Sequence, residues 1–361
     1  MIKSFLLIFL IFSTSAYSQT IDDSACWEYF KITENLKKDQ PLDQQTWKNF
    51  LKNKAIQVYL KDQGVDSTYL ENYRKIMEVV YMPKNNSKLQ QRLKEPTNNW
   101  WTYIVNQYKE NEDKMKTYLN TLKNNPKDYL ASCYQYTYTM LPKKNHTTAP
   151  EYKITIIPIH NDAHVENGWL IYTLMAAYFN DYNKPGTLGG HEFHHILRPR
   201  MDFDVEKEDA VIVSLLQRIL NEGSADLIDK RYQGEDAVKL LEFQRGYPES
   251  FITDGYKTIK HIDSLLSIKS LDRSTLKLNK LFNSWNTSGH IPGYYMADII
   301  EKGGYKKQLV KHIEDPFQFV YLYNKASQKV KGAYILSEPT MDLIENLNQK
   351  YKGKSRIIQH Q

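Results

Sequence analysis

Helical periodicity dominates the first part of the chain. Apolar residues recur three or four positions apart, as in Trp47, Phe50 and Leu51, which places them on one face of a helix where they can be buried together. We therefore expect residues 19–145 to form a helical region. Its many tryptophans and tyrosines, among them the pair at 100–101, are interpreted as packing groups between helices rather than as a platform for a ligand.

The pattern changes after a loop. Residues 143–150 have loop composition and mark the expected boundary between two regions. The next segment, 154–159, is short and β-branched, and its proline is tolerated only at a sheet edge or at the end of a strand. We expect a strand there, at or near an edge, followed by a turn at Asn161–Asp162. A second apolar segment, 169–174, is either a strand or the start of a helix.

Beyond residue 186 the periodicity is helical again. Helices and strands are thus segregated along the chain, which is typical of a mostly α (α+β) fold with one small sheet. Residues 350–361 are expected to form a solvated basic tail. The predicted helices of this part are 209–228, 235–243, 257–266, 293–301 and 339–348.

The N-terminus has the composition of a secretory signal. Lys3 precedes the apolar run 5–12, and small residues follow, so residues 1–18 are expected to be removed after Ser18. The apolar run is too short to cross a bilayer, and no later segment approaches the length of a spanning helix. We therefore expect an exported protein, periplasmic or secreted, without a membrane span.

Composition limits the classes of partner. The formal net charge of +6 is spread over mixed acids and bases, which is too weak and scattered for a nucleic-acid-binding surface. In an oxidising compartment Cys26 and Cys133 either form one disulfide or remain two separate buried thiols, and the sequence leaves both open. It also gives no indication of the oligomeric state.

The chemistry centres on the HExxH element at residues 191–195. On an α-helix, residues four apart lie one turn above each other, so His191 and His195 can both direct an imidazole nitrogen at one zinc ion. Glu192 then lies beside the ion, where a carboxylate can take a proton from water acidified by the metal and deliver it to a leaving amine. His194 shares this face, but His195 completes the motif. We expect His194 to support the ligands or to pack.

The surrounding residues favour a short helix that packs closely on its neighbour. Gly189 and Gly190 lack side chains, so another backbone can approach the start of the helix. Pro199 should end the helix promptly, because the residue before a proline is disfavoured in helical conformation.

A catalytic zinc ion takes three protein ligands and leaves a fourth position for water, so a third donor is needed. Glu222 is the best candidate, because it lies one turn beyond Ile219 in a run with the spacing of a buried helix. A carboxylate buried there needs a partner, and a metal ion supplies one. Asp226, one turn further, could accept the second N–H of a ligating histidine and fix its orientation.

The HExxH element followed by Asn-Glu-Gly-Ser-Ala-Asp at 221–226 resembles the gluzincins, the zinc peptidases whose third ligand is a glutamate. The resemblance implies a zincin-like catalytic region over residues 146–349. The connection is longer than in the gluzincin pattern, since 26 residues (196–221) separate the motif from Glu222. Over roughly residues 150–310 the sequence more nearly resembles a bacterial family of zinc-dependent peptidases of unknown function. The roles implied are one zinc ion on His191, His195 and Glu222, general base for Glu192, and support of a ligand for Asp226.

A downstream segment offers donors for the negative charge that develops on a substrate carbonyl. Residues 288–297 join a glycine-rich turn to a helix start and contain His290, Tyr294 and Tyr295. These residues resemble, in their order along the chain, the downstream histidine or tyrosine of zinc peptidases of this type. Either at least one of them is catalytic, or the tyrosines belong to the core and His290 to a loop.

A peptide substrate is expected to bind as an extra strand along an exposed sheet edge. The segment 154–159 or the segment around His164 could provide that edge. His160 and His164 are spaced four apart, but we interpret them as flanking a turn rather than as a second metal site.

The leading hypothesis is therefore an exported zinc metallopeptidase acting on a peptide or protein substrate. The alternatives are a zinc hydrolase of another ester or amide bond, and a non-catalytic binding protein that uses zinc structurally or not at all. Glu192 distinguishes them, because a structural zinc site has no use for a base and usually closes with a fourth protein ligand.

Overall fold

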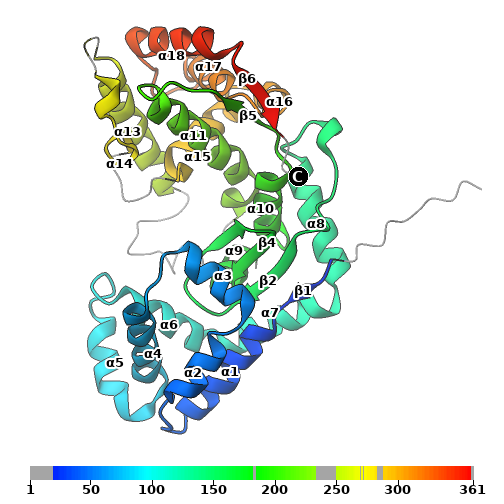
Figure 1. Cartoon of the computed structure of the whole chain (residues 1–361), viewed down its shortest axis with the longest axis vertical. Coiled ribbons are helices and arrows are strands. Elements are labelled where there is room, and N and C mark those ends of the chain that lie inside the picture. Colours follow the sequence, from blue (N-terminus) through cyan, green and yellow to red (C-terminus); the bar gives the residue numbers. More distant parts are fainter. Residues whose placement is uncertain are drawn as a thin grey trace, which may run out of the picture.

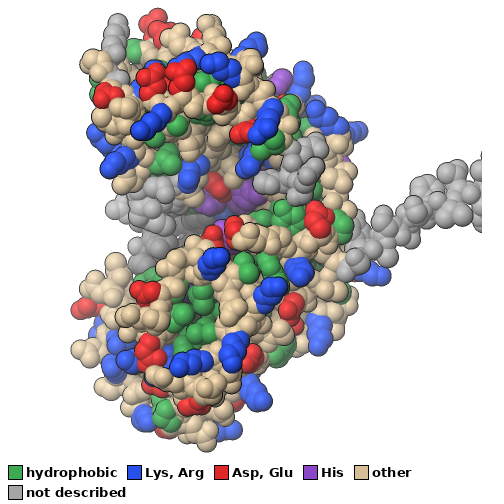
Figure 2. All heavy atoms as spheres, in the orientation of Figure 1, with side chains coloured by type: hydrophobic (Ala, Val, Ile, Leu, Met, Phe, Trp, Pro, Cys, Tyr) green, Lys and Arg blue, Asp and Glu red, His purple; other side chains and the backbone are tan. Residues whose placement is uncertain are grey.

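The computed structural model has two mainly helical lobes joined beside a small sheet, with a hollow between them (Figures 1 and 2). It describes residues 19–358 except 182–183, 233–248, 269, 271 and 283–287. The expected signal segment, 1–18, and the expected helix 235–243 lie outside the described residues. The mostly α (α+β) fold class is confirmed. None of the described helices has the length and apolar character needed to cross a membrane.

The N-terminal helical region is confirmed, and several of its helices begin at capping side chains. Asp43, Asn53 and Asp66 precede α2, α3 and α4, and each accepts a hydrogen bond from a backbone N–H of the first turn. The helices are α1 (Ser24–Leu36), α2 (Gln44–Phe50), α3 (Lys54–Asp62), α4 (Ser67–Tyr81), α5 (Asn86–Leu93), α6 (Trp100–Glu110), α7 (Glu112–Asn124) and α8 (Pro126–Tyr138).

The main sheet has the strand order β1-β2-β4-β3, in which only β3 runs antiparallel to its neighbour among the described strands. The expected strand at 154–159 is β2. It is not the edge strand itself, but it lies next to the edge strand β1, with β4 on its other side, so the expected position near an edge is confirmed. Pro158 follows the last residue of β2 and therefore lies at a strand end. The strands are β1 (Ile21–Asp22), β2 (Lys153–Ile157), β3 (Ala163–Glu166) and β4 (Trp169–Thr173).

The segment 169–174 forms β4 and leads directly into α9 (Leu174–Asp181). Asp181, the last residue of α9, fixes the start of the next helix, α10 (Thr187–Leu197), because its carboxylate accepts a hydrogen bond from the Leu188 N–H at 2.9 Å. The Tyr129 hydroxyl donates to the same carboxylate at 2.5 Å. Burial raises the pKa of Asp181 to about 6.

Close packing of α10 on α8 confirms the expectation for the paired glycines. A Cβ at Gly189 would overlap Cys133, and a Cβ at Gly190 would lie 2.7 Å from the Cβ of Tyr136. Cys133 and Cys26 are both free and buried, so the alternative of two separate thiols holds. Cys26 donates instead to the carbonyl of Ile156 in β2, at 3.3 Å.

The second lobe is built from the later helices, and the predictions at 209–228, 257–266, 293–301 and 339–348 all correspond to helices of the structure. The helices are α11 (Ala210–Asp229), α13 (Glu249–Leu266), α14 (Leu278–Phe282), α15 (His290–Lys302), α16 (Lys306–Lys311), α17 (Pro316–Ser327) and α18 (Glu338–Tyr351). Short 3₁₀ turns lie at Pro83–Asn85, Lys143–Asn145, Lys230–Tyr232 and Arg273–Thr275.

The C-terminal segment is part of the fold rather than a solvated tail. Strand β6 (Ser355–Ile358) pairs antiparallel with β5 (Arg200–Phe203). Lys350 makes ion pairs with Glu206 and Asp209 at 2.7 and 2.8 Å. Cations that look unpaired in the sequence therefore meet acids that lie more than a hundred residues earlier.

The two hydrophobic cores do not divide at residue 146. Strands β2 to β4 and helix α10 share one core with the N-terminal helices, whereas α11 to α18 build the other. The division of the cores falls between α10 and α11, the two helices that carry the HExxH element and Glu222. The candidate site therefore lies where the lobes join.

Candidate metal centre

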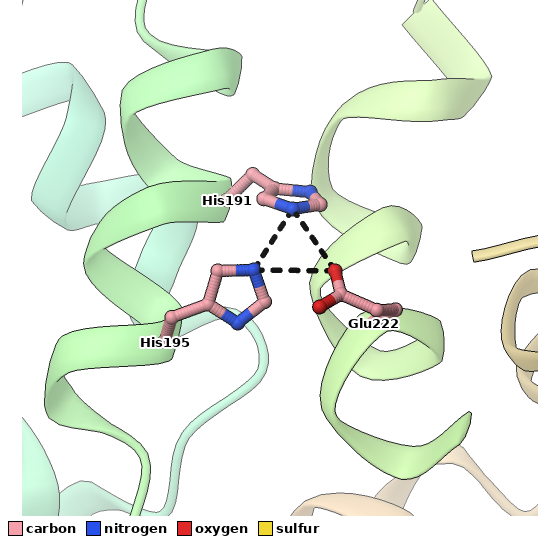
Figure 3. Close-up of side chains that lie close together, drawn as sticks. All are labelled: His191, His195 and Glu222. Atoms are coloured by element: carbon pink, nitrogen blue, oxygen red, sulfur yellow. Dashed lines mark hydrogen bonds and ion pairs between the residues drawn. The ribbon is translucent and has the colours of Figure 1, made fainter. Parts of the chain in front are cut away.

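Three side chains from α10 and α11 point toward one another (Figure 3). The Nε2 atoms of His191 and His195 are 3.0 Å apart. Glu222 Oε2 lies 3.7 Å from His191 Nε2 and 3.4 Å from His195 Nε2. The convergence expected from the sequence is thus present in the structure.

These separations, from 3.0 to 3.7 Å, lie within a few tenths of an ångström of those around a tetrahedral zinc ion. Zinc binds nitrogen and oxygen ligands at about 2.0–2.2 Å, and tetrahedral geometry then places the ligand atoms about 3.3–3.6 Å apart. Burial favours the neutral form of Glu222, but the charges of His290 and His195 outweigh it and hold its pKa well below the ordinary value. The carboxylate is therefore ionised, as a metal ligand must be.

Asp229 orients His191. The other ring nitrogen of this histidine, Nδ1, lies 3.1 Å from Asp229 Oδ1 and 3.6 Å from Asp226 Oδ1. Our expectation that Asp226 supports a ligand histidine is corrected accordingly, because Asp229 holds that place. Lys230 lies 2.8 Å from the other oxygen of Asp229. Burial alone would lower the pKa of His191, but the charge of Asp229 outweighs it and raises that pKa well above the ordinary value.

Asp226 instead holds His290. His290 Nδ1 lies 3.0 and 3.2 Å from the two oxygens of Asp226 and 3.3 Å from Glu222 Oε2. A contact between two glycines brings His290 to this position. Helix α15 crosses α11 with Gly293 against Gly223, and a Cβ at either glycine would overlap the backbone of the other. A second potential ligand group, His191, Asp226 and His290, is thus accounted for by hydrogen bonding.

The two downstream tyrosines do not reach the cleft. Tyr294 is buried and packs edge-on against Phe251. Tyr295 is also buried, and its hydroxyl accepts a hydrogen bond from the Tyr334 N–H at 3.0 Å. Neither lines the cleft around the metal ligands, whereas His290 does. Of the three expected donors, His290 therefore fits the geometry and the tyrosines belong to the core.

Glu192 and His194 both belong to α10, but their side chains have different surroundings. Glu192 lines the cleft, and its negative charge helps to raise the pKa of Asp162. His194 is fully buried, and neither of its ring nitrogens has a hydrogen-bond partner among the described residues. Burial, with the nearby charge of Arg198, lowers the pKa of His194 well below its ordinary value. His194 is thus a neutral packing group.

The three candidate ligands line a cleft of about 1310 Å³. Figure 2 shows histidine side chains inside the hollow between the lobes. The edge strand β3 contributes Ala163, His164 and Val165 to the wall of this cleft. Asp162, just before β3, is exposed to the cleft, and the protein around it still displaces part of the water from its carboxylate. This desolvation, together with the charge of Glu192, raises its pKa to about 6.

Asp229 and Lys230 were not identified from the sequence. The available signal was the run of charges at 226–230 at the end of a helix predicted to be buried, since buried charges need partners. Local spacing could not show which of the two aspartates meets His191, because this depends on how α10 and α11 cross.

Replacing Asp229 by asparagine is expected to weaken zinc binding by about 10- to 100-fold, because outer hydrogen-bond partners of ligating histidines typically contribute that much. The measurement is a competition titration with a zinc-chelating dye. Asp226→Asn is the matched control, because it loosens His290 and should leave the affinity within a fewfold of wild type. Equal losses in both variants would contradict the assignment of Asp229.

Of three comparisons with known proteins, one found a match. No curated protein and no solved structure shows significant similarity to the chain. One family model does match it, over residues 47–332, which include the helices that carry all the ligands. The chain therefore belongs to the family described as "Putative zinc dependent peptidase (DUF5700)".

Proposed function

We propose that this protein is an exported zinc metallopeptidase that hydrolyses peptide bonds with Glu192 as the general base. The observation that carries the proposal is the convergence of two imidazoles and a carboxylate at an open cleft, with a further carboxylate on the same helix. Membership of a family of zinc-dependent peptidases supports the general class. Export is inferred from the signal-like composition of residues 1–18.

The chemistry follows from the positions of the side chains. Zinc held by His191, His195 and Glu222 would supply Lewis acidity, which lowers the pKa of a bound water and polarises a carbonyl. Glu192 follows His191 on α10 and lines the cleft, so its carboxylate can accept the proton of the attacking water. The same carboxyl group can then donate that proton to the departing amine.

His290 is placed to stabilise the oxyanion. Asp226 holds its Nδ1, which leaves Nε2 as the nitrogen available to a substrate. Burial by itself lowers the pKa of His290, but the charges of Asp226 and Glu222 outweigh it and raise that pKa above the ordinary value. The protonated, donating form of the imidazole is therefore favoured, which suits the negative charge that develops on the carbonyl oxygen.

A polypeptide fits the cleft better than a small molecule. Its volume of about 1310 Å³ exceeds the range of about 300–1,000 Å³ usual for small-molecule sites. β3 is an edge strand, so its outer backbone groups can pair with an extended peptide. We infer that the substrate binds along β3, the second of the two edges expected from the sequence.

The proposal is tested with the purified chain from residue 19 onward. It should bind one equivalent of zinc and cleave members of a mixed peptide library, detected by mass spectrometry. A zinc chelator should abolish cleavage and added zinc should restore it. A zinc-loaded protein that binds peptides but cleaves none of them would favour the non-catalytic binding protein instead.

His290→Ala is expected to lower kcat by about 10²- to 10³-fold, the usual effect of removing one oxyanion donor. Zinc content and KM should stay close to wild type, because His290 is not a ligand in this assignment. Tyr295→Phe is the matched control, since it removes a hydroxyl that lies outside the cleft and bonds to the Tyr334 backbone and the Tyr323 side chain. Loss of zinc from His290→Ala would instead place His290 among the ligands.

A further inference from the structure

One side of the cleft is formed by aromatic rings that the proposed mechanism does not use. Tyr59, Trp100, Trp101 and His160 line the same cleft as the metal ligands, and we call these four residues the aromatic wall. The helices that carry the tyrosine and the tryptophans, α3 and α6, lie in the lower lobe in Figure 1. The two tryptophans are only partly buried, so their rings remain accessible from the cleft.

His160 is held rigidly at the centre of the wall. Its Nδ1 lies 3.2 Å from the Tyr59 hydroxyl and its Nε2 lies 2.7 Å from the Tyr69 hydroxyl. The Trp101 ring lies against it, with centroids 4.5 Å apart and planes inclined by 30°. The Tyr108 hydroxyl donates to the His160 carbonyl at 3.0 Å. Ring and backbone are therefore both fixed by neighbours.

The backbone of His160 is strained. Its φ of +66° lies in the left-handed region, which a residue with a side chain rarely adopts. Such strain persists only where the surroundings over-determine it, and it concentrates at sites that bind or react.

The wall is uncharged. Burial lowers the pKa of His160 to about 4, so the imidazole stays neutral at physiological pH. An uncharged surface of aromatic rings favours apolar and aromatic groups, which bury large areas and stack against the rings.

The wall adjoins the strand on which the substrate is proposed to lie. His160 is followed by Asn161 and Asp162, and β3 begins at Ala163, so the chain runs from the wall directly into the edge strand. Successive side chains of a bound strand point to opposite sides, so alternate residues of the substrate can enter pockets beside the edge.

We propose that the aromatic wall is a specificity subsite that binds an apolar, preferably aromatic, side chain of the polypeptide substrate. This inference rests on the proposed peptidase function, which it deepens. It also replaces the interpretation of Trp100 and Trp101 as packing groups only.

The test uses two peptides that differ only by phenylalanine or alanine at one position, taken from library sequences that are cleaved. For wild type, kcat/KM should be at least about tenfold higher with phenylalanine at one position near the cleaved bond. Trp101→Leu keeps an apolar side chain but removes the ring, and it should abolish most of that preference. Kinetics with the alanine peptide should change less than about twofold.

Two further measurements separate an effect of the aromatic wall from a general loss of stability or activity. Trp27→Ala, a partly buried tryptophan of α1 outside the cleft, is the matched control and should retain the preference. Calorimetry measures the affinity of the peptides for two zinc-loaded proteins, Glu192→Gln and the double variant Glu192→Gln/Trp101→Leu. The comparison reports on the aromatic wall even if no peptide is cleaved. Equal losses for both peptides in Trp101→Leu, or a wild-type kcat/KM that is no higher with phenylalanine than with alanine, would overturn the subsite.

Discussion

Glu192→Gln is expected to lower kcat by about 10²- to 10⁴-fold while one equivalent of zinc stays bound. General acid–base catalysis typically contributes a factor of this size, and glutamine cannot accept the proton. The substitution preserves the shape of a side chain that is 5 % exposed, so the fold should not change. Initial rates under saturating peptide, together with metal analysis of the same samples, measure both quantities.

The control for this variant is another carboxylate of the cleft. Asp162→Asn removes a charge that interacts with Glu192 but comes from the turn before β3 rather than from α10. It should keep kcat within about tenfold of wild type, since Asp162 is assigned no proton transfer. Comparable kcat for Glu192→Gln and wild type would contradict the role of Glu192, whatever the zinc content.

Glu222→Ala is expected to abolish stable zinc binding and, with it, peptide cleavage. Loss of a direct ligand should cost more than the 10- to 100-fold typical of an outer hydrogen-bond partner. It also removes the carboxylate that lies within 3.7 Å of both ligand imidazoles, which would then face each other without a counter-charge. Dialysis against a weak chelator followed by metal analysis measures the loss.

Glu208→Ala is the matched control for that loss. Glu208 precedes the same helix, but it is exposed and pairs with Arg273 at 3.1 Å. It has no proposed role in the site. Its removal should leave both zinc content and activity unchanged. Retention of tightly bound zinc by Glu222→Ala would mean that another residue is the third ligand.

The convergence of the three candidate ligands was predictable because it depends on local spacing. His191 and His195 share a face of any regular helix, and Glu222 is a charge on a helix whose other residues predict burial. The sequence left open only whether the two helices, α10 and α11, pack side by side. The hydrogen-bond partner of His191 was not predictable, because a small rotation of α11 decides between Asp226 and Asp229.

Long-range pairing accounts for the other differences. β2 became an interior strand because Ile21 and Asp22, which are more than 130 positions earlier, pair with it. Residues 355–358 became a strand because β5 offers them a partner. The local sequence pattern of a strand does not show which distant strand will pair with it. In the same way, helical periodicity could not show that Trp100 and Trp101 face a cleft.

The central claim is that two imidazole nitrogens and one carboxylate oxygen bind a single zinc ion and leave a position open. A crystal structure of the zinc-loaded protein, with anomalous data collected at the zinc absorption edge, tests it most directly. The account predicts one strong peak about 2.0–2.2 Å from His191, His195 and Glu222, with solvent as the remaining ligand. An empty pocket, or a fourth side chain bound to the ion, would contradict it.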